Sequence, residues 1–418
     1  MSIVGSLFVA SDALGTLSNA ISVAGDNIAN LNTVGFKASR IDFADLLSTI
    51  DGQIEIGHGV RLADVNKMFQ QGALETTQSV TDLAIQGGGF FILKNGAGET
   101  FYSRAGEFHV DANSNLVNPL GLFLQGASGN ISLGAALTLP AQATTSLGLR
   151  VSLDAAAATP GAAFPAGPDA SPGAWNAAGN FSSVTTVYDS AGAAHDLTFL
   201  FRKNGANSWD YRILAQRREL DATASTSTDL RDLGAGGTLL FNPDGRFNVA
   251  GSTVSGFTGV SWVVGGGTQT IAPGSLTFAG SVQYAQPSSL MSLSSDGYGV
   301  GFLTGVSIDG GGAITGRYSN GVTRPIGAIV LANFASPDGL DPAGDGLYRA
   351  TAESGAALTG APGQNGMGQI VSGALEMSTV DLAREMVALI TSQRSFQINS
   401  RIITVADQMY AEAAKLKQ

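Results

Sequence analysis

Cysteine is absent from this chain of 418 residues, and it has only three histidines, His58, His109 and His195. Without cysteine the chain forms neither disulfides nor thiolate metal sites, and its redox compartment stays open. The histidines lie in unrelated local contexts with no helical spacing between them, so a histidine-based metal site has little support. We therefore expect no metal and no cofactor.

Sequence patterns typical of enzymes are also missing. None of G-x-G-x-x-G, G-x-x-x-x-G-K or G-x-S-x-G occurs. The glycine clusters at 87–89, 265–267 and 310–312 lack the following helix that a phosphate site needs, so turns or bulges explain them better. The stretch SPDGLDPAGDG at 336–346 offers several carboxylates, but its spacing matches no known calcium loop and favours solvated turns. The chain is predicted not to be an enzyme.

Charge and long apolar runs are scarce as well. Charged residues make up 13% of the chain and the net charge is −11, which argues against a nucleic-acid partner because such binding needs clustered lysine and arginine. No apolar run reaches the roughly 18 residues of a membrane helix, so no membrane insertion is expected. The N-terminus lacks the basic region and compact apolar core of a secretory signal peptide. This favours the cytoplasm, or export by a route that does not read such a signal.

Periodic apolar sequence, in contrast, is plentiful near the N-terminus. Apolar residues recur there alternately every four and every three residues, which is the a/d heptad pattern of a helix that packs along another helix. The N-terminal seam consists of six large residues, Ile3, Leu7, Leu14, Leu17, Ile21 and Ile28, together with Ala10, Ala24 and Leu31. Three glycines in this segment each cost about 1 kcal/mol relative to alanine in a helix, so the helix needs a partner that buries its seam.

The C-terminal end has the same character. A C-terminal seam of residues spaced by seven consists of Leu382, Leu389, Phe396, Ile403 and Tyr410. Further apolar residues, among them Met386, Ile390, Ile402 and Met409, make this stripe wider than one helix partner requires. The pattern predicts a helix over 392–417. Because surplus apolar surface usually indicates more neighbours, we expect both ends to become ordered in a polymer of subunits stacked side by side; helices that merely cover the β domains are the alternative.

The centre of the chain reads as β structure. Short runs rich in valine, isoleucine, threonine and aromatic residues are separated by glycine, asparagine and aspartate turn signals. The predicted fold is mainly β with helical termini, in which an inner all-β domain is interrupted by an outer one. The predicted parts are a helical domain of 1–31 with 375–418, a connector of 32–72 with 351–374, an inner β domain of 73–145 with 286–350, and an outer β domain of 146–285.

The sequence GDNIANLNTVGFKASR at 25–40 marks the change from helix to strand. Its asparagines could bind a polar ligand, but no acid, base or nucleophile accompanies them. We interpret it as a helix end, in which Asn27, Asn30 and Asn32 with Gly35 stop the helix and Phe36 begins the connector. Gly35 is expected to take a positive φ. The junction then holds the angle between the helix and the domains beyond it.

The same stretch closely resembles the N-terminal signature of the bacterial flagellar rod and hook axial protein family. Further blocks of the chain resemble that family in their usual order: FQQGALETTQSVTDLAIQGGGFFIL at 69–93, YSRAGEFHVDANSNLVNPLGLFLQG at 102–126, and the region from GLYRATAESG to the C-terminal helix. The central residues, about 146–285, carry no such signature. A large insertion at this place resembles the hook members of the family rather than the shorter rod members.

This resemblance implies a structural role. It implies subunits that leave the cell through the flagellar type III export apparatus and polymerise beneath a cap into a curved tube, which transmits torque from rod to filament as a universal joint. The implied partners are further copies of the chain, the distal rod protein, the hook cap protein and the hook–filament junction protein, and the implied location is the extracellular flagellar hook. Alternatives are another axial component, such as a distal rod or hook–filament junction protein, and a secreted carbohydrate-binding or adhesive β protein.

Overall fold

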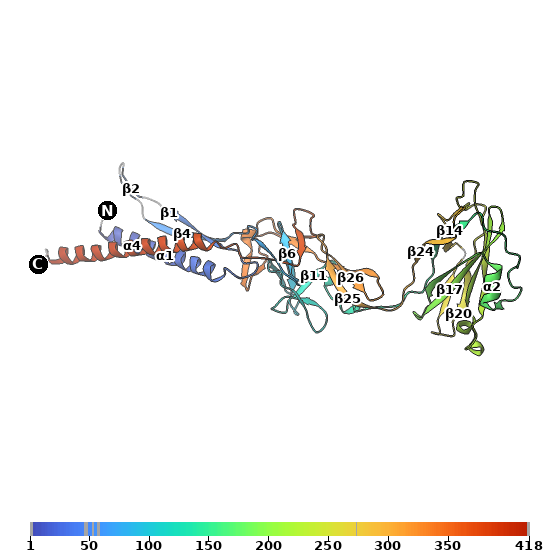
Figure 1. The fold of residues 1–418 in the computed structure, drawn as a ribbon. Coiled ribbons are helices and arrows are strands. Elements are labelled where there is room, and N and C mark those ends of the chain that lie inside the picture. The colour runs from blue at the N-terminus through green and yellow to red at the C-terminus, as the bar shows by residue number, and fades with distance from the viewer. Residues whose placement is uncertain (1–2, 46–48, 52–53, 57–58, 273, 416–418) are drawn as a thin grey trace. The chain divides into compact units, whose positions relative to one another are not determined.

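Two long helices occupy the ends of the chain and β-strands fill the sequence between them, as the sequence predicts (Figure 1). The computed structural model describes residues 3–45, 49–51, 54–56, 59–272 and 274–415. The helices are α1 (Ile3–Ala29) and α4 (Leu382–Lys415), and they pack against each other. The chain forms two units: the first comprises 1–136, 306–316 and 324–418, and the second 137–305 and 317–323. The four-part domain division made from the sequence stays a prediction.

The N-terminal helix is apolar on average although it contains no continuous apolar run. Residues Leu7–Ala29 have a mean hydropathy of 1.3 and are long and apolar enough, by length and composition alone, to cross a membrane, a test that the core helix of a soluble protein also passes. Alanine, glycine and serine interrupt the large residues of this helix without adding charge. In the structure this helix packs against α4 and the strands β1 (Ser39–Asp45) and β4 (Val60–Lys67).

The first unit builds its β structure from segments that are distant in sequence. Its largest sheet has the order β29-β30-β8-β7-β11-β10-β9, with β12, β28 and β31 attached. The bounds are β29 (Asp341–Gly344), β30 (Leu347–Arg349), β8 (Thr100–Ser103), β7 (Phe90–Lys94), β11 (Phe123–Gly126), β10 (Leu116–Val117), β9 (His109–Val110), β12 (Gly129–Asn130), β28 (Leu331–Asn333) and β31 (Leu358–Gly360). Its core combines side chains from both halves of the chain, including Phe91, Leu93, Leu124, Ile329 and Leu331.

Smaller strand pairs lie between this large sheet and the helices along the chain. Strand β1 pairs antiparallel with β4, and the hairpin of β2 (Thr49–Asp51) and β3 (Ile54–Ile56) lies between them in sequence. Strand β5 (Leu74–Thr76) pairs with β33 (Ala374–Glu376), and β6 (Leu83–Gln86) pairs with β32 (Gln369–Ser372). A further sheet has the order β13-β25-β26-β27, with bounds Thr138–Leu139, Gly301–Ile308, Ala313–Tyr318 and Thr323–Ala328.

The second unit is made almost entirely from one continuous stretch. Its five-stranded sheet runs β15 (Asp169–Ala170), β19 (Leu230–Leu240), β18 (Ser208–Gln216), β17 (Ala194–Gly205) and β16 (Phe181–Tyr188). A second sheet centres on β14 (Leu147–Asp154), which pairs with β22 (Leu276–Thr277), β23 (Val282–Tyr284) and β24 (Ser289–Ser295). The hairpin of β20 (Phe257–Ser261) and β21 (Thr268–Ile271) completes it. Aromatic side chains such as Phe199, Trp209 and Tyr211 fill the core.

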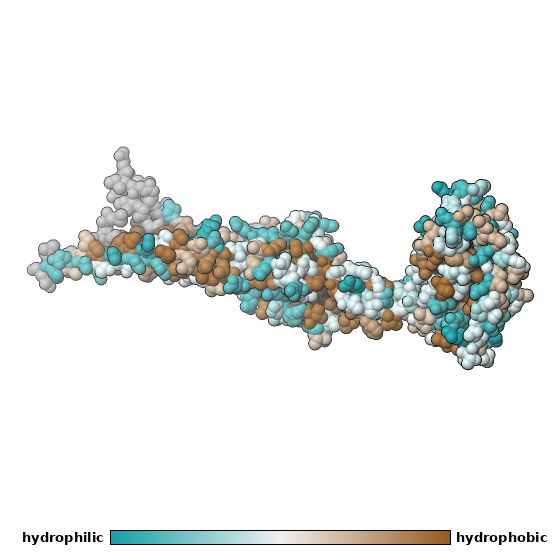
Figure 2. All heavy atoms as spheres, viewed as in Figure 1, coloured by the Kyte–Doolittle hydropathy of each residue, from teal (hydrophilic) through white to brown (hydrophobic). Residues whose placement is uncertain are grey.

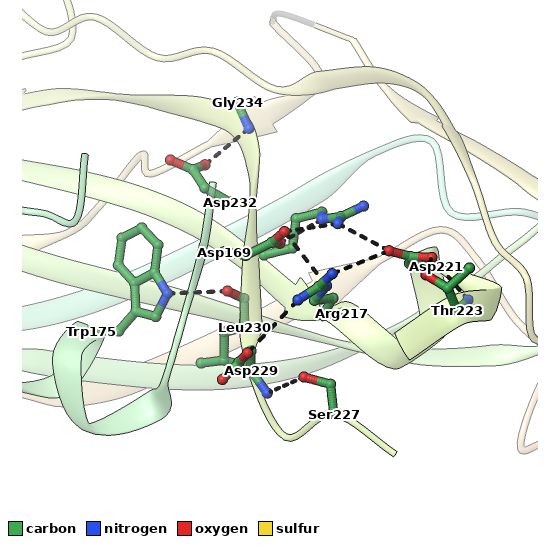
Figure 3. Close-up of polar contacts among 11 residues, drawn as sticks. Asp169, Trp175, Arg217, Asp221, Thr223, Ser227, Asp229, Leu230, Asp232 and Gly234 are labelled. Carbon is green, nitrogen blue, oxygen red and sulfur yellow. Dashed lines mark hydrogen bonds and ion pairs between the residues drawn. The ribbon is translucent and has the colours of Figure 1, made fainter. Parts of the chain in front are cut away.

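The alanine-, proline- and glycine-rich stretch 155–174 covers one face of the five-stranded sheet. It contains β15 and leads into the short helix α2 (Pro172–Ala178), whose Trp175 is buried with Leu200 and Leu214. Further along, α3 (Arg217–Leu220) follows β18, and Figure 3 shows the polar contacts that join it to Asp169 and Asp221. The stretch 155–174 is thus fixed to the sheet by one apolar cluster and one ionic network.

Candidate assembly site

The N-terminal seam lies in α1, where its large residues are only half-buried in the single chain. Leu7, Leu14, Leu17, Ile21 and Ile28 are all in this intermediate range, as is Leu31 just beyond the helix, while Ala10 and Ala24 are buried. Ile3 belongs to α1, but its side chain lies outside the described residues. Phe8, which the heptad pattern does not include, is 67% exposed. One helical partner therefore leaves a substantial part of this apolar surface accessible.

The C-terminal seam is more exposed. Leu389 and Ile403 are half-buried, whereas Leu382, Phe396 and Tyr410 are exposed. Among the described side chains of α4 only the small Ala406 is buried, while Ser392 and Asn399 are half-buried like the two leucine and isoleucine positions. Large apolar side chains remain exposed along the rest of the helix, as the brown atoms over the helical pair in Figure 2 show; they include Met386, Val387, Ile390, Ile398, Ile402, Val405 and Met409. Full burial of each would contribute about 1.5–3 kcal/mol.

The junction after α1 is held by Asn27, in a way that differs from the expectation. Asn27 lies inside α1 and is buried, so it does not end the helix. Its side-chain amide donates to the Ser39 carbonyl at 2.8 Å, and its Oδ1 accepts from the Ser39 amide at 2.9 Å. Because the side chain of asparagine reproduces the donor and acceptor of a peptide group, it pairs with the first residue of β1 as a neighbouring strand would.

The helix end itself follows two residues later. Asn30 accepts from the Thr33 hydroxyl through Oδ1 at 3.0 Å and donates to the Asp26 carbonyl at 2.9 Å, so it closes the last turn as expected. Asn32 is exposed in the turn that follows. Phe36 is half-buried and its ring lies 4.5 Å from Nζ of Lys67, a cation–π contact to β4.

Gly35 has the positive φ that the sequence predicts, at 69°. Its amide donates to the carbonyl of Glu376 at 2.7 Å, which links the junction to the C-terminal strand β33. A Cβ atom at this position would lie 2.5 Å from the backbone nitrogen of Ala105 and 2.7 Å from the carbonyl carbon of Arg104. The backbone passes so close to β8 that only glycine fits without displacement.

Behind Gly35 lies a cluster of buried charges, which we call the junction triad: Lys37, Arg104 and Glu376. Nζ of Lys37 is 2.6 Å from Oε1 of Glu376, and both side chains are fully buried. NH1 of Arg104 is 3.4 Å from Oε2 of the same carboxylate. Lys37 also donates to the carbonyl of Gln70 at 2.6 Å, and the Gly72 amide donates to Oε1 of Glu376 at 2.8 Å. The carboxylate of Glu376 thus joins β33 to three other segments of the chain, those of Lys37, Gly72 and Arg104.

The electrostatics of the junction triad are dominated by desolvation. Burial lowers the pKa of Lys37, and the neighbouring carboxylate of Glu376 opposes this shift. Burial lowers the pKa of Arg104 in the same way, again opposed by Glu376. The Arg104 guanidinium lies over the ring of Phe90 at 5.3 Å, while its Nε has no hydrogen-bond partner among the described residues. Both cations depend on a single anion, so that anion is indispensable to the arrangement.

The sequence reading did not identify this triad. Lys37 stands out as the first basic residue and as part of the N-terminal signature, and this was the one available signal. Arg104 and Glu376 lie in the blocks YSRAGEF and SGALEMS, where nothing in the sequence distinguishes a buried charge from a solvated one. Only the pairing of β33 with β5 brings Glu376 to the junction.

The remaining candidate positions are the histidines and the carboxylates of 336–346. His58 lies outside the described residues, and His109 is exposed on β9. His195 is buried on β17, with its ring nitrogens 3.3 Å from Asp189 and 3.0 Å from Glu219. Within the described part of the chain, no group of three or more histidine, aspartate and glutamate residues is placed to hold a metal ion. The carboxylates of 336–346 lie in a short 3₁₀ turn, in the exposed strand β29 and in the turn that follows it.

Comparison with known families gives matches from residue 7 to residue 416, with gaps at 38–83 and 299–370. Four family models match in order: "Flagella basal body rod protein" at residues 7–37, "Flagellar hook protein FlgE/F/G D1 domain" at 84–152, "Flagellar basal body protein FlaE D2 domain" at 152–298, and "Flagellar basal body rod FlgEFG protein C-terminal" at 371–416. The first and last of these matches contain most of α1 and α4.

Individual relatives extend over the same length. The flagellar hook protein FlgE of Escherichia coli is 34% identical over 95% of this chain and 96% of its own. The corresponding protein of Borreliella burgdorferi is 35% identical over 94% of this chain and 95% of its own. Among solved structures, the Helicobacter pylori flagellar hook protein FlgE2 covers 72% of this chain and all of its own, with a TM-score of 0.52 and 15% identity, so it supports the fold.

Proposed function

The chain belongs to the flagellar hook protein FlgE family and is a structural subunit of the bacterial flagellar hook; from this premise we propose that α1 and α4 are its polymerisation surfaces. The observation that carries the proposal is the large apolar area that the helical pair leaves exposed in the single chain, above all along α4. Neighbouring copies that bury both seams would supply the partners that a two-helix pair lacks.

The junction gives these helices a fixed attachment. Asn27, Gly35 and the junction triad fasten the end of α1 to β1, β8 and β33 without a flexible linker. A load applied to the helices is then transferred to the β structure through buried polar contacts. We propose that this coupling carries torque through the hook tube, while weaker contacts between β surfaces change as the tube bends.

The resemblance to hook proteins also suggests partners and a route. We propose that the subunit leaves the cell through the flagellar type III export apparatus without a cleaved signal peptide and polymerises beneath the hook cap protein. It would then contact the distal rod protein at one end of the tube and the hook–filament junction protein at the other. The absence of cysteine fits passage in an unfolded state, because no disulfide can form before export.

The alternative functions lack comparable support. A distal rod or hook–filament junction component would match its own relatives over the whole chain, whereas the matches are to hook proteins at 94–95% coverage. The two relatives described above are both hook proteins, and neither is named as a carbohydrate-binding or adhesive protein.

Deletion of residues 1–31 tests the proposal most directly. We expect a soluble protein that retains its β structure by circular dichroism but forms no tubes by electron microscopy at concentrations where the full chain polymerises.

A finer test replaces Ile398, which is 61% exposed, with serine. This should raise the critical concentration about tenfold or more, because each buried apolar side chain contributes at least about 1.5 kcal/mol. The neighbouring exposed Gln397→Ser is the matched control; tubes that form normally from the deletion variant would contradict the proposal.

A further inference from the structure

The junction triad unites residues from opposite ends of the chain. Lys37 lies between α1 and β1, Arg104 follows β8, and Glu376 ends β33, 339 residues after Lys37. All three are buried in the folded first unit. The carboxylate that both cations need is therefore the last of the three to be synthesised, and in a complete unfolded chain its pairing with Lys37 must close the longest loop.

An incomplete junction is unfavourable for a specific electrostatic reason. Without Glu376, docking of α1 on the sheet would bury the Lys37 ammonium and the Arg104 guanidinium near each other with no anion between them. Two like charges out of water cost far more than two solvated ones, and each side chain would keep its hydration shell instead. The contacts that fix the end of α1, such as Asn27 with Ser39, cannot close while Lys37 two residues away stays solvated.

We propose that the junction triad sets the order of folding: α1 stays detached from the rest of the first unit until β33 has docked and placed Glu376 between the two cations. We call this role of the triad a closure lock. Strands β7 and β8 form a local hairpin that does not involve the C-terminal segment. The hairpin is free to form early, while the junction closes late. The polymerisation role of α1 rests on the proposed function above; in that setting the lock prevents an incomplete subunit from presenting a fixed helix to its neighbours.

Pulsed hydrogen exchange during refolding of the unmodified chain tests the order of closure. The Ser39 amide is a suitable probe because its partner, Asn27, belongs to the N-terminal segment and not to β33. We expect Ser39 to become protected in the same kinetic phase as the β33 amides and after the β7–β8 hairpin. Protection of Ser39 before β33 would overturn the proposal. A Ser39 amide that stays unprotected in the monomer after β33 has formed would also overturn the proposal, and this outcome is distinct from a failure of the chain to polymerise.

A double-mutant cycle on the full chain tests the electrostatic cause. Glu376→Gln should lower the protection of the Ser39 and Gly72 amides about 100-fold or more, because it leaves two unpaired buried cations. Lys37→Met should lower it less, since Arg104 keeps the carboxylate. The double variant Lys37→Met with Glu376→Gln should be at least about tenfold better protected than Glu376→Gln alone, because one stranded charge has been removed.

A double variant that is less protected than Glu376→Gln alone would overturn the proposal. Side chains that merely pack together would give that result, because each substitution removes further contacts. Glu107→Gln, an exposed carboxylate of the same unit, serves as the control and should change nothing. Equal loss of protection in β17 and β18 of the second unit would indicate global unfolding and would likewise contradict a local lock. Should Glu376→Gln fail to fold, the refolding order of the unmodified chain still decides the question.

Discussion

The two units of this chain obtain their strands in different ways. The first unit joins strands from the N-terminal and C-terminal thirds, so that β7 pairs with β28 and β6 with β32. The second unit takes nearly all its strands from residues 137–305. Folding of the second unit therefore requires little more than its own stretch of chain, although β14 pairs with β22, β23 and β24 at the far end of that stretch, while the first unit waits for the end of the chain. The unit that carries the helices is the one whose folding depends on a complete subunit.

The units also differ in where they place charge. The first unit buries the junction triad, with Lys37 and Glu376 fully inaccessible. The second unit keeps its ionic network of Asp169, Arg217 and Arg231 partly solvated at the edge of its sheet. Figure 3 shows the polar contacts of Asp169 and Arg217 in this network. Buried ion pairs are costly to break and solvated pairs are not. Equivalent substitutions in the two units should therefore have different consequences.

Truncation of one core phenylalanine in each unit should give the largest contrast. Phe91 on β7 and Phe199 on β17 are both fully buried, and each makes an edge-to-face contact with another phenylalanine. Replacement of either by alanine should cost about 3–5 kcal/mol. We expect Phe199→Ala to lower only the unfolding transition of the second unit in calorimetry, while Phe91→Ala lowers that of the first and prevents tube formation. A common shift of one shared transition in both variants would show that the units do not unfold separately.

Gly35→Val should be the next largest effect and should be confined to the junction. The substitution forces a β-branched residue to a φ of 69° and places Cβ against the backbone of β8, so we expect a loss of about 2–4 kcal/mol. Gly98→Val is the matched control, because Gly98 also has a positive φ, 90°, but has nothing within 4 Å of its Cβ position. Urea unfolding of the first unit measures both. Equal losses at the two positions would mean that backbone strain alone, and not the close approach to β8, decides the outcome.

The sequence predicted the helices and the overall class well, for a simple physical reason. Apolar residues at heptad spacing in Leu7, Leu14 and Ile21 allow only one regular structure to gather them on one side. The prediction that Asn27 ends the helix was wrong, because the sequence does not distinguish an asparagine inside a helix from one at its end until the hydrogen-bond partner of its side chain is known. That partner, the backbone of Ser39, is set by how the chain turns back after α1.

The junction triad and the strand order were beyond the sequence. Pairing of Leu74 with Glu376 depends on which of many short strands meet after the chain has folded back, and single-sequence patterns carry no information on that. Lysine is rarely buried, so the sequence favours a solvated Lys37. Its burial becomes evident only when Glu376 and Arg104 are placed around it.

Alkaline unfolding should affect the two units to a similar, smaller extent. Burial raises the pKa of Tyr348 in the first unit and of Tyr211 in the second, each to about 12. A tyrosine in the unfolded chain ionises near pH 10, so the buried tyrosine of each unit makes its full contribution to the free energy of unfolding below pH 10. As the pH rises to about 12, each unit loses about 2–3 kcal/mol of that free energy. Urea unfolding at several pH values checks this.

Phenylalanine variants isolate the tyrosine contribution from that of other groups. Tyr348→Phe should remove the decline between pH 10 and 12 in the first unit only, and Tyr211→Phe in the second only. Tyr211 also hydrogen-bonds the backbone of Ser255 through its hydroxyl, at 2.9 Å to the carbonyl, so its phenylalanine variant should start from a lower stability at neutral pH. A decline that persists unchanged in both variants would assign it to other residues.

The smallest effect is expected at the ionic network of the second unit, and it completes the contrast with the junction triad. Arg231 contacts Asp169 through two hydrogen bonds of 2.6 and 2.9 Å, yet both side chains are about one quarter exposed. The hydrogen bond from Arg231 is the main cause of the lowered pKa of Asp169. Arg231→Met should cost less than about 1 kcal/mol, and the loss should shrink further in 1 M salt because solvent and ions already screen the pair. Arg246→Met, at an isolated pair with 3.9 Å between Arg246 and Asp244, should cost nothing measurable.

The junction triad is buried away from water and ions, so the free energy of unfolding lost in Glu376→Gln should not change with salt concentration. A salt-dependent loss in Glu376→Gln would show that burial is not what separates the two networks. A salt-independent loss in Arg231→Met would show the same.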